Sequence, residues 1–317
     1  MRKKRILGNV KKELLVRELN QARFIRKTNK DNNEIYIFDY HSAPNLMLEV
    51  ARLRETTFRK AGGGTGNYLD IDHFDFQQQP YKQLIVWDPV QKEIAGGYRF
   101  AWVPEVTQSC RYLSRITFSD HFNFSGDFVE NYLPWSIELG RAFITPKYQS
   151  TGVIRKSIFI LDNLWDGLGA LIKLYPDARY FFGKVTLYRQ FPEDAKLMLL
   201  NFMYNYFGQT GLVKPIHPME LPFGGQKIHT TKTFSEIEND YAELSGMMRK
   251  MGTPVPPMFN AYLKLSPSIK VMGTFHNKDF GNTDETAILI TIRDIYSHKL
   301  ERYTGIQSTQ ELLKKAG

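Results

Sequence analysis

The chain has 317 residues, of which 42% are hydrophobic and 24% charged, so it can bury a substantial core and does not have the composition of a disordered protein. Its one cysteine, Cys110, excludes an intramolecular disulfide framework and a cysteine-rich metal site. The net charge of +9 calls for an anionic partner, and nucleic acid, anionic lipid, a phosphorylated cofactor and an acidic carrier protein all qualify.

Residues 1–33 are predicted to be a basic N-terminal extension. Only Ile6 and Leu7 follow the first basic run before Gly8, so the apolar core of a signal peptide is absent. No stretch approaches the roughly 18–20 consecutive apolar residues of a membrane span. Leucines at helical spacing around residues 14–19 fit either an anionic membrane surface or packing on the core. We expect a cytoplasmic protein, either soluble or in peripheral contact with the inner face of the membrane.

Residues 34–317 are predicted to form a single domain of strands and helices. A short turn at 89–92 joins two strands into an antiparallel hairpin. A polar insertion with proline and glycine, at about 208–257, is the best candidate for a lid or a peripheral subdomain. From the apolar periodicity we expect strands at 35–38, 83–88, 93–102, 135–144, 180–187 and 286–292, and helices at 46–60, 152–173, 194–207, 236–250 and 258–264.

The loop that opens the helix at 152–173 is a candidate phosphate site. Backbone N–H groups at a helix N-terminus bind phosphate, and two basic side chains follow the loop. An ordinary helix start explains the same pattern without a ligand. The predicted donor-binding residues are Gln149, Ser150, Thr151, Gly152, Val153, Arg155 and Lys156.

An acidic segment follows the glycine-rich loop at 61–66. Asp70, Asp72 and Asp75 are natural partners for a cationic amine or for Arg54 on the preceding helix. A solvated turn and a calcium loop are the alternatives, although the terminal glutamate of a calcium loop is missing. Arg99 is predicted to hold a carboxylate or to steady this acidic segment, and a plain arginine on the strand surface is the alternative.

The order of strand, loop and helix resembles the central donor-binding motif of the GNAT acyltransferase superfamily. Gln149 and Gly152 match this motif, whereas Ile154 replaces its small final residue. A donor with a single phosphate, such as the phosphopantetheine arm of an acyl carrier protein, tolerates that replacement better than coenzyme A.

Further motifs resemble two carrier-dependent GNAT branches, the acyl-homoserine-lactone synthases and the hemolysin-like N-acyltransferases that make ornithine and glycine lipids. The lipid branch fits better because segments 256–263 and 279–284 resemble its C-terminal part, so the similarity spans about residues 46–292. The matching residues, in chain order, are Arg54, Phe58, Asp70, Asp72, Asp75, Arg99, Glu138 and Arg141.

The resemblance implies a GNAT-like α/β (α+β) fold with a mixed, mostly antiparallel central sheet flanked by helices. It implies transfer of a 3-hydroxy fatty acyl group from acyl carrier protein to the α-amine of glycine or ornithine, in amino-acid lipid synthesis. No cofactor is expected to be bound permanently, and an acyl-coenzyme A donor is the alternative. The residues from Arg54 to Asp75 are then substrate-binding, and Arg99, Glu138 and Arg141 are catalytic.

Glu138 is predicted to be the base, acting through a water molecule if it does not reach the amine directly. Three positions separate it from Arg141, so a regular strand would place the two on opposite faces unless Gly140 forms a bulge. A structural ion pair or separate partners within the sheet are the alternatives for these two residues. Backbone N–H groups near Phe143 and Ile144 are predicted to polarise the thioester carbonyl.

Several other enzyme classes lack their motifs. None of the seven histidines is followed five positions later by aspartate, which argues against the His-x4-Asp glycerolipid acyltransferases, and no histidine pair has metal-binding spacing. A nucleophile elbow and a phosphate-binding P-loop are also missing. An acetyl-coenzyme A N-acetyltransferase stays as the second hypothesis. A nucleic-acid-binding module with 17 tyrosines and 22 phenylalanines is the third, but most of these aromatics fall in core patterns, so nucleic acid is not expected as a partner.

Overall fold

The computed structural model describes residues 3–20, 23–149, 154–222 and 234–305. An eight-stranded sheet in the order β1-β2-β3-β4-β6-β7-β10-β9 forms its centre. The strands are β1 (Phe24–Lys27), β2 (Glu34–Phe38), β3 (Lys82–Asp88), β4 (Glu93–Trp102), β6 (Ser136–Ile144), β7 (Tyr180–Leu187), β9 (Lys270–Asn277) and β10 (Thr283–Thr291).

Every neighbouring pair in this sheet is antiparallel except β6 with β7, which run parallel. The predicted fold class, a mixed and mostly antiparallel sheet flanked by helices, is therefore confirmed. A separate two-stranded sheet pairs β5 (Phe122–Phe124) with β8 (Val213–Pro215).

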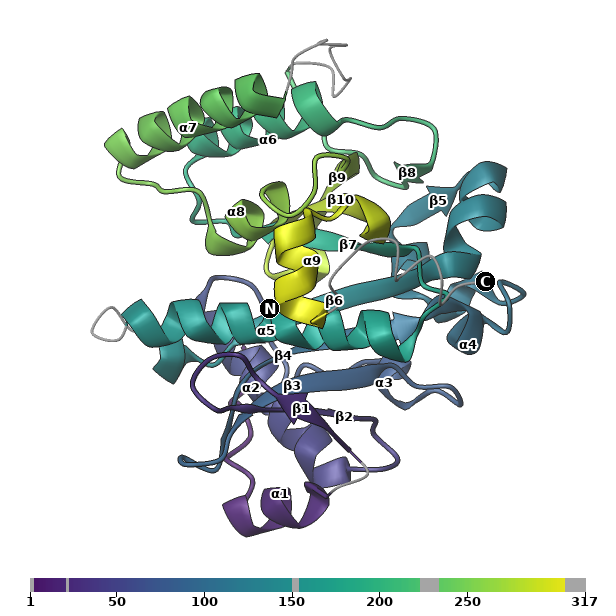
Figure 1. The fold of residues 1–317 in the computed structure, drawn as a ribbon, viewed down its shortest axis with the longest axis vertical. Coiled ribbons are helices and arrows are strands. Elements are labelled where there is room, and N and C mark those ends of the chain that lie inside the picture. The colour runs from purple at the N-terminus through teal and green to yellow at the C-terminus, as the bar shows by residue number, and fades with distance from the viewer. Residues whose placement is uncertain (1–2, 21–22, 150–153, 223–233, 306–317) are drawn as a thin grey trace.

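Strand alternation distributes the apolar residues between two faces. Leu84 and Val86 of β3 pack in one hydrophobic cluster with α5 (Ile154–Leu174), whereas Ile85 and Trp87 pack in another with α2 (Pro44–Lys60). Figure 1 shows α1 (Lys12–Glu18) at one end of the molecule and α6 (Glu193–Phe207) with α7 (Phe234–Lys250) at the other. The remaining α-helices of the described residues are α3 (His73–Phe76), α4 (Val103–Thr107), α8 (Pro257–Leu263) and α9 (Ser297–Thr304).

The sheet separates between its two parallel strands. The pairing of β6 with β7 ends at Leu139 and Gly183, although β6 continues to Ile144 and β7 to Leu187. Backbone groups of β6 that face β7 beyond Leu139 therefore have no strand partner there. We call this opening the splay.

A β-bulge lies at the same place in β6. Gly97 of β4 pairs with Phe143 and Arg99 pairs with Gly140, so two β6 residues lie opposite one β4 residue. Arg141, the first of the two, has a φ of 50°, in the left-handed region. The possible bulge at Gly140 therefore exists and is centred one residue later.

The predicted N-terminal extension contributes to the sheet and its packing. Residues 24–27 form edge strand β1, which pairs with β2, so a boundary at 33 falls within a hairpin. Leu15 of α1 is buried in the hydrophobic cluster that also contains residues of α2. For the leucines around residues 14–19, the structure therefore agrees with packing on the core, the second of the two alternatives expected from the sequence. Strand β9 and helix α9 were not expected from the sequence. In the predicted insertion at about 208–257, helix α7 packs on α6.

Candidate active site

A cavity of about 2290 Å³ opens at the splay, and both strands that form the splay line it. On the α5 side its wall is apolar and includes Leu164, Ile288 and Phe259. On the opposite side it is polar and includes Arg99 and Lys184. The cavity therefore connects an apolar chamber to a charged chamber at the point where two strands part.

The charged side rests on an arginine–aspartate cluster, which we define as Arg54, Arg99, Arg141, Asp70, Asp72 and Asp75. Buried Arg54 of α2 donates to Asp75 Oδ2 at 3.1 Å and to the backbone oxygen of Asp70 at 2.7 Å.

The other two arginines reach the same carboxylates from the sheet. Arg99 Nη1 lies 2.6 Å from Asp72 Oδ1 and 3.2 Å from Asp75 Oδ2. Arg141 Nε lies 3.1 Å from Asp70. Each charge thus has an opposite partner, and the alternatives of a solvated turn and a strand-surface arginine do not describe these residues.

The cluster keeps Asp72 and Asp75 ionised. Burial raises the pKa of Asp72, but the guanidinium groups of Arg99 and Arg141 outweigh it and hold that pKa well below its usual range. Asp75 has a lowered pKa because Arg54 and Arg99 outweigh the effect of burial. Asp72 also caps α3 by accepting from the Phe74 N–H at 3.1 Å.

The predicted substrate-binding residues divide into two groups. Phe58 and Asp72 line the cavity, whereas Arg54, Asp70 and Asp75 are fully buried behind its wall. The three buried residues can therefore affect a substrate only by supporting the residues that line the cavity.

Glu138 is enclosed on the same face of the sheet. Its side chain is 1% exposed, and its two oxygens accept hydrogen bonds from the hydroxyls of Tyr81 and Thr117. Burial raises the pKa of Glu138, against the opposing effects of these hydrogen bonds and of Lys184 and Arg99. Thr117 lines the cavity and Glu138 does not, so the hydroxyl of Thr117 lies between this carboxylate and the open space.

The bulge determines where Arg141 points. Ile137 and Leu139 pack in the α5 cluster, so Glu138 between them faces the other way. Arg141 contacts Asp70 and lies with its guanidinium 4.6 Å from the centre of the Phe280 ring, also on the α2 side. The two residues therefore share a face but keep separate partners, which is one of the alternatives set out above.

One backbone N–H near the bulge faces the splay. The N–H of Thr145 donates to the Ala95 oxygen at 2.9 Å, so by antiparallel alternation the N–H and C=O of Ile144 point away from β4. The Ile144 oxygen indeed accepts a hydrogen bond from the side chain of Gln149. Of the two predicted carbonyl-polarising groups, the Ile144 N–H is the one directed toward β7.

The donor-binding loop is described only in part. Gln149 lines the cavity and ends a short turn after β6. The other predicted residues, Ser150, Thr151, Gly152 and Val153 together with the side chains of Arg155 and Lys156, lie outside the described residues. Their phosphate-binding role stays a prediction.

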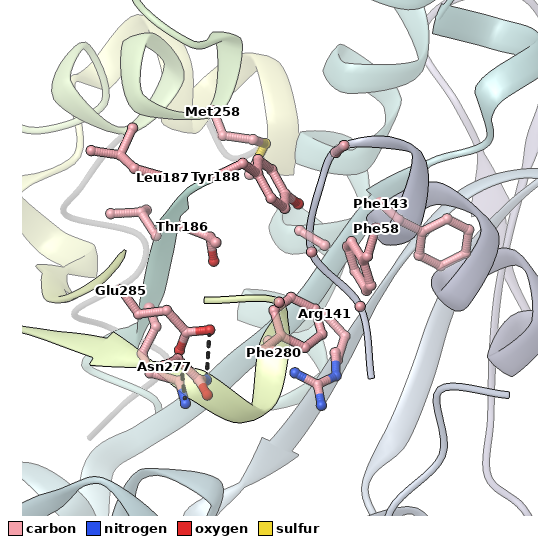
Figure 2. A pocket seen from close by; sticks show the side chains of 18 of the residues that line it. Phe58, Arg141, Phe143, Thr186, Leu187, Tyr188, Met258, Asn277, Phe280 and Glu285 are labelled. Atoms are coloured by element: carbon pink, nitrogen blue, oxygen red, sulfur yellow. Dashed lines mark hydrogen bonds and ion pairs between the residues drawn. The ribbon is translucent and has the colours of Figure 1, made fainter. Parts of the chain in front are cut away.

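Sequence reasoning missed a second charged group on β7, β9 and β10. Lys184 Nζ lies 3.2 Å from Glu285 Oε2, and Asn277 Nδ2 donates to Glu285 Oε1 at 3.1 Å. All three line the cavity, and Figure 2 shows Glu285 and Asn277 facing the hollow across from Arg141. The only signal in the sequence is a charged pair, Asp284 and Glu285, at the start of an apolar strand.

Two features of other protein classes are missing from the described part of the chain. No helix there is long and apolar enough to cross a membrane. No group of three or more histidine, cysteine, aspartate or glutamate side chains in these same ranges is arranged to hold a metal ion.

Comparison with known proteins gives the following matches. Residues 53–158 match the family model of an acetyltransferase (GNAT) domain. A protein of Bacteroides thetaiotaomicron named glycine N(alpha)-acyltransferase is 44% identical over 98% of this chain and 93% of its own length. A protein of Phocaeicola vulgatus with the same name is 42% identical over 94% of this chain and 92% of its own length. No solved structure gives a significant match.

Proposed function

The chain belongs to the family of GNAT-type N-acyltransferases that includes these two relatives, and from this membership we propose that it transfers a 3-hydroxy fatty acyl group from acyl carrier protein to the α-amine of glycine. The chain is an acyltransferase, because it belongs to a family of acyltransferases. The similarity over almost the whole chain to proteins named for glycine is the observation that supports this amine over ornithine.

The size and chemistry of the cavity support a long acyl group. Its volume of about 2290 Å³ exceeds the range of about 300–1,000 Å³ that is typical of small-ligand pockets. The two-carbon group of acetyl-coenzyme A would leave the apolar chamber around Leu164, Phe259 and Ile288 empty. A fatty acyl chain would fill it, with the thioester at the splay.

The proposed reaction begins at the ammonium of glycine. One proton leaves this ammonium and passes through the hydroxyl of Thr117 to Glu138, whose raised pKa makes it a better proton acceptor than an ordinary glutamate. The free amine attacks the thioester carbonyl carbon, and the Ile144 N–H stabilises the negative charge on the carbonyl oxygen. The carbon–nitrogen bond forms, the carbon–sulfur bond breaks, and the thiolate takes the second amine proton.

The proposal includes two anionic partners, the acyl carrier protein and the inner face of the membrane. A net charge of +9 suits an acidic carrier protein, and it suits the anionic inner face of the membrane that would receive an N-acylglycine for lipid synthesis. Neither partner alters the chemistry of the transfer.

Product analysis by mass spectrometry tests the proposal. The purified protein is incubated with 3-hydroxyacyl carrier protein or acetyl-coenzyme A and with glycine, ornithine and other free amino acids. We expect long-chain N-acylglycine from the carrier donor, and much less of it from Glu138→Gln. Acetylated product alone would support the acetyltransferase hypothesis, and no product from either donor would contradict both.

A further inference from the structure

The second charged group of the cavity contains a buried carboxylate that the mechanism above does not use. Glu285 is 3% exposed, and the next residues on its side of β10, Ala287 and Leu289, are apolar. Its Oε2 atom lies 3.2 Å from the ammonium group of Lys184, without the alignment of a hydrogen bond, and no other described residue donates to it. A buried ion pair of this kind is often no more stable than apolar side chains of similar size, so stability alone does not explain it.

This group lies beside the expected position of the reacting thioester. Lys184 is the first β7 residue after the last one paired with β6, and Glu285 pairs with Thr186 on the next strand. Arg141 stands on the other side of the splay, 20% exposed, with Nε and Nη2 directed at aspartates. Figure 2 shows Glu285 and Thr186 on one side of the hollow and Arg141 with Phe280 on the other.

The charges around this space match both ends of a free amino acid. Burial raises the pKa of Glu285, but Lys184 and Arg141 outweigh it and keep the carboxylate ionised. Burial and the charge of Lys184 lower the pKa of His121 to about 4, so this imidazole is neutral and stacks on Phe275 with 4.5 Å between ring centres. Beside the splay, the carboxylate of Glu285 thus lies with the cations Lys184 and Arg141.

We propose that Glu285 and Lys184 form the acceptor subsite, where Glu285 binds the α-ammonium group and Lys184 binds the α-carboxylate of the amino acid. This inference rests on the proposed function, because it assigns the residues that hold its acceptor. Glu285 Oε2 has the hydrogen-bonding capacity that an ammonium group would fill. Asn277 holds the other oxygen and is a positioning residue.

The assignment separates two carboxylates by role. Glu285, with a lowered pKa, is suited to binding a positive charge, whereas Glu138, with a raised pKa, is suited to accepting a proton. Lys184 lies close enough to both to affect the pKa of each.

Steady-state kinetics of the purified full-length chain tests the subsite, with glycine varied at a saturating concentration of the acyl donor that the wild type uses. Glu285→Gln and Lys184→Met should each raise the KM for glycine about tenfold or more, as expected for losing a charge-assisted hydrogen bond, while the KM for the donor stays within about twofold. Lys278→Met and Asp279→Asn are matched controls, because both side chains also line the cavity but are exposed, and they should change neither KM.

A second arm compares glycine with glycinamide, which keeps the ammonium group and lacks the carboxylate. The wild type should prefer glycine in kcat/KM by about tenfold or more, and Lys184→Met should bring this ratio close to one. A merely structural lysine would lower both rates and leave the ratio unchanged. This arm gives a result on the wild type even if a variant does not fold.

The outcomes distinguish the subsite from the proposed function. If the wild type makes no N-acylglycine with either donor, the proposed function fails. If it does, and the variants leave the KM for glycine unchanged, or raise both KM values together, or the wild type uses glycinamide as well as glycine, the acceptor subsite alone is overturned.

Discussion

The two groups of charged residues on one face of the sheet differ in the number of opposite charges around each member. In the arginine–aspartate cluster each guanidinium faces at least one carboxylate, and Arg54 is completely buried. In the group on β7, β9 and β10, Lys184 and Glu285 form a single ion pair at the cavity wall, and the side chain of Lys184 is 16% exposed. A network of three arginines and three aspartates indicates a support that fixes the loop at 70–75, whereas a single ion pair at a cavity wall indicates a place for a ligand.

The largest expected effect is on the free energy of unfolding, and its absence would contradict this comparison. Arg54→Met leaves Asp70 and Asp75 buried without their main partner, so we expect a loss of about 3–5 kcal/mol in the free energy of unfolding. Lys184→Met should cost only about 1–2 kcal/mol, because water in the cavity can solvate Glu285. Urea unfolding at neutral pH measures both.

Arg17→Met is the control for this experiment, because Arg17 is exposed on α1. It should change the free energy of unfolding by less than about 0.5 kcal/mol. Equal losses for Arg54→Met and Lys184→Met would show that the two groups are both structural supports.

Glu138→Gln should have the next largest effect, on rate rather than on stability. Glutamine keeps the shape, and its amide oxygen can accept from one of the hydroxyls of Tyr81 and Thr117 while its NH2 group donates to the other, but it cannot accept a proton, so kcat should fall about a hundredfold or more. The wild-type kcat should also rise with pH through the raised pKa of Glu138, because its deprotonated form is the active one. Glu105→Gln, at an exposed ion pair with Lys82, is the control.

Thr117→Val should have a smaller effect on the same step. The substitution keeps the volume but removes the hydroxyl between Glu138 and the cavity, so kcat should fall about tenfold with little change in the KM for glycine. An unchanged kcat would mean that the amine reaches its base by another route.

The smallest expected effect concerns the exposed edge of the arginine–aspartate cluster. Asparagine at position 72 can still cap α3, so Asp72→Asn should lower the free energy of unfolding by about 1 kcal/mol at pH 7. The folded-state pKa of Asp72 is depressed, so its contribution is present above the unfolded value of about 4 and is lost as the pH falls through the folded value. The difference between wild type and variant should therefore shrink below about pH 4. A difference that stays constant with pH would exclude an electrostatic origin.

Much of the fold could be predicted because local periodicity reflects burial. The strands at 83–88 and 93–102 and the helix at 46–60 carry apolar residues on the faces that are buried, and they lie within about two residues of their predicted ends. Strand β1 was missed because Phe24–Lys27 is short and half polar.

The candidate site, like the fold, could be predicted from the sequence only in part. The sequence by itself determined the spaced motif residues, and their spacing left open a bulge at Gly140 as the one way to bring Glu138 and Arg141 to the same face. Only the tertiary structure decided that Thr117 and Tyr81 enclose Glu138, and that Lys184, Asn277 and Glu285 meet. The physical reason is that these contacts depend on the order of the strands in the sheet and on the separation of β6 from β7, which join residues far apart in the chain and leave no local periodicity.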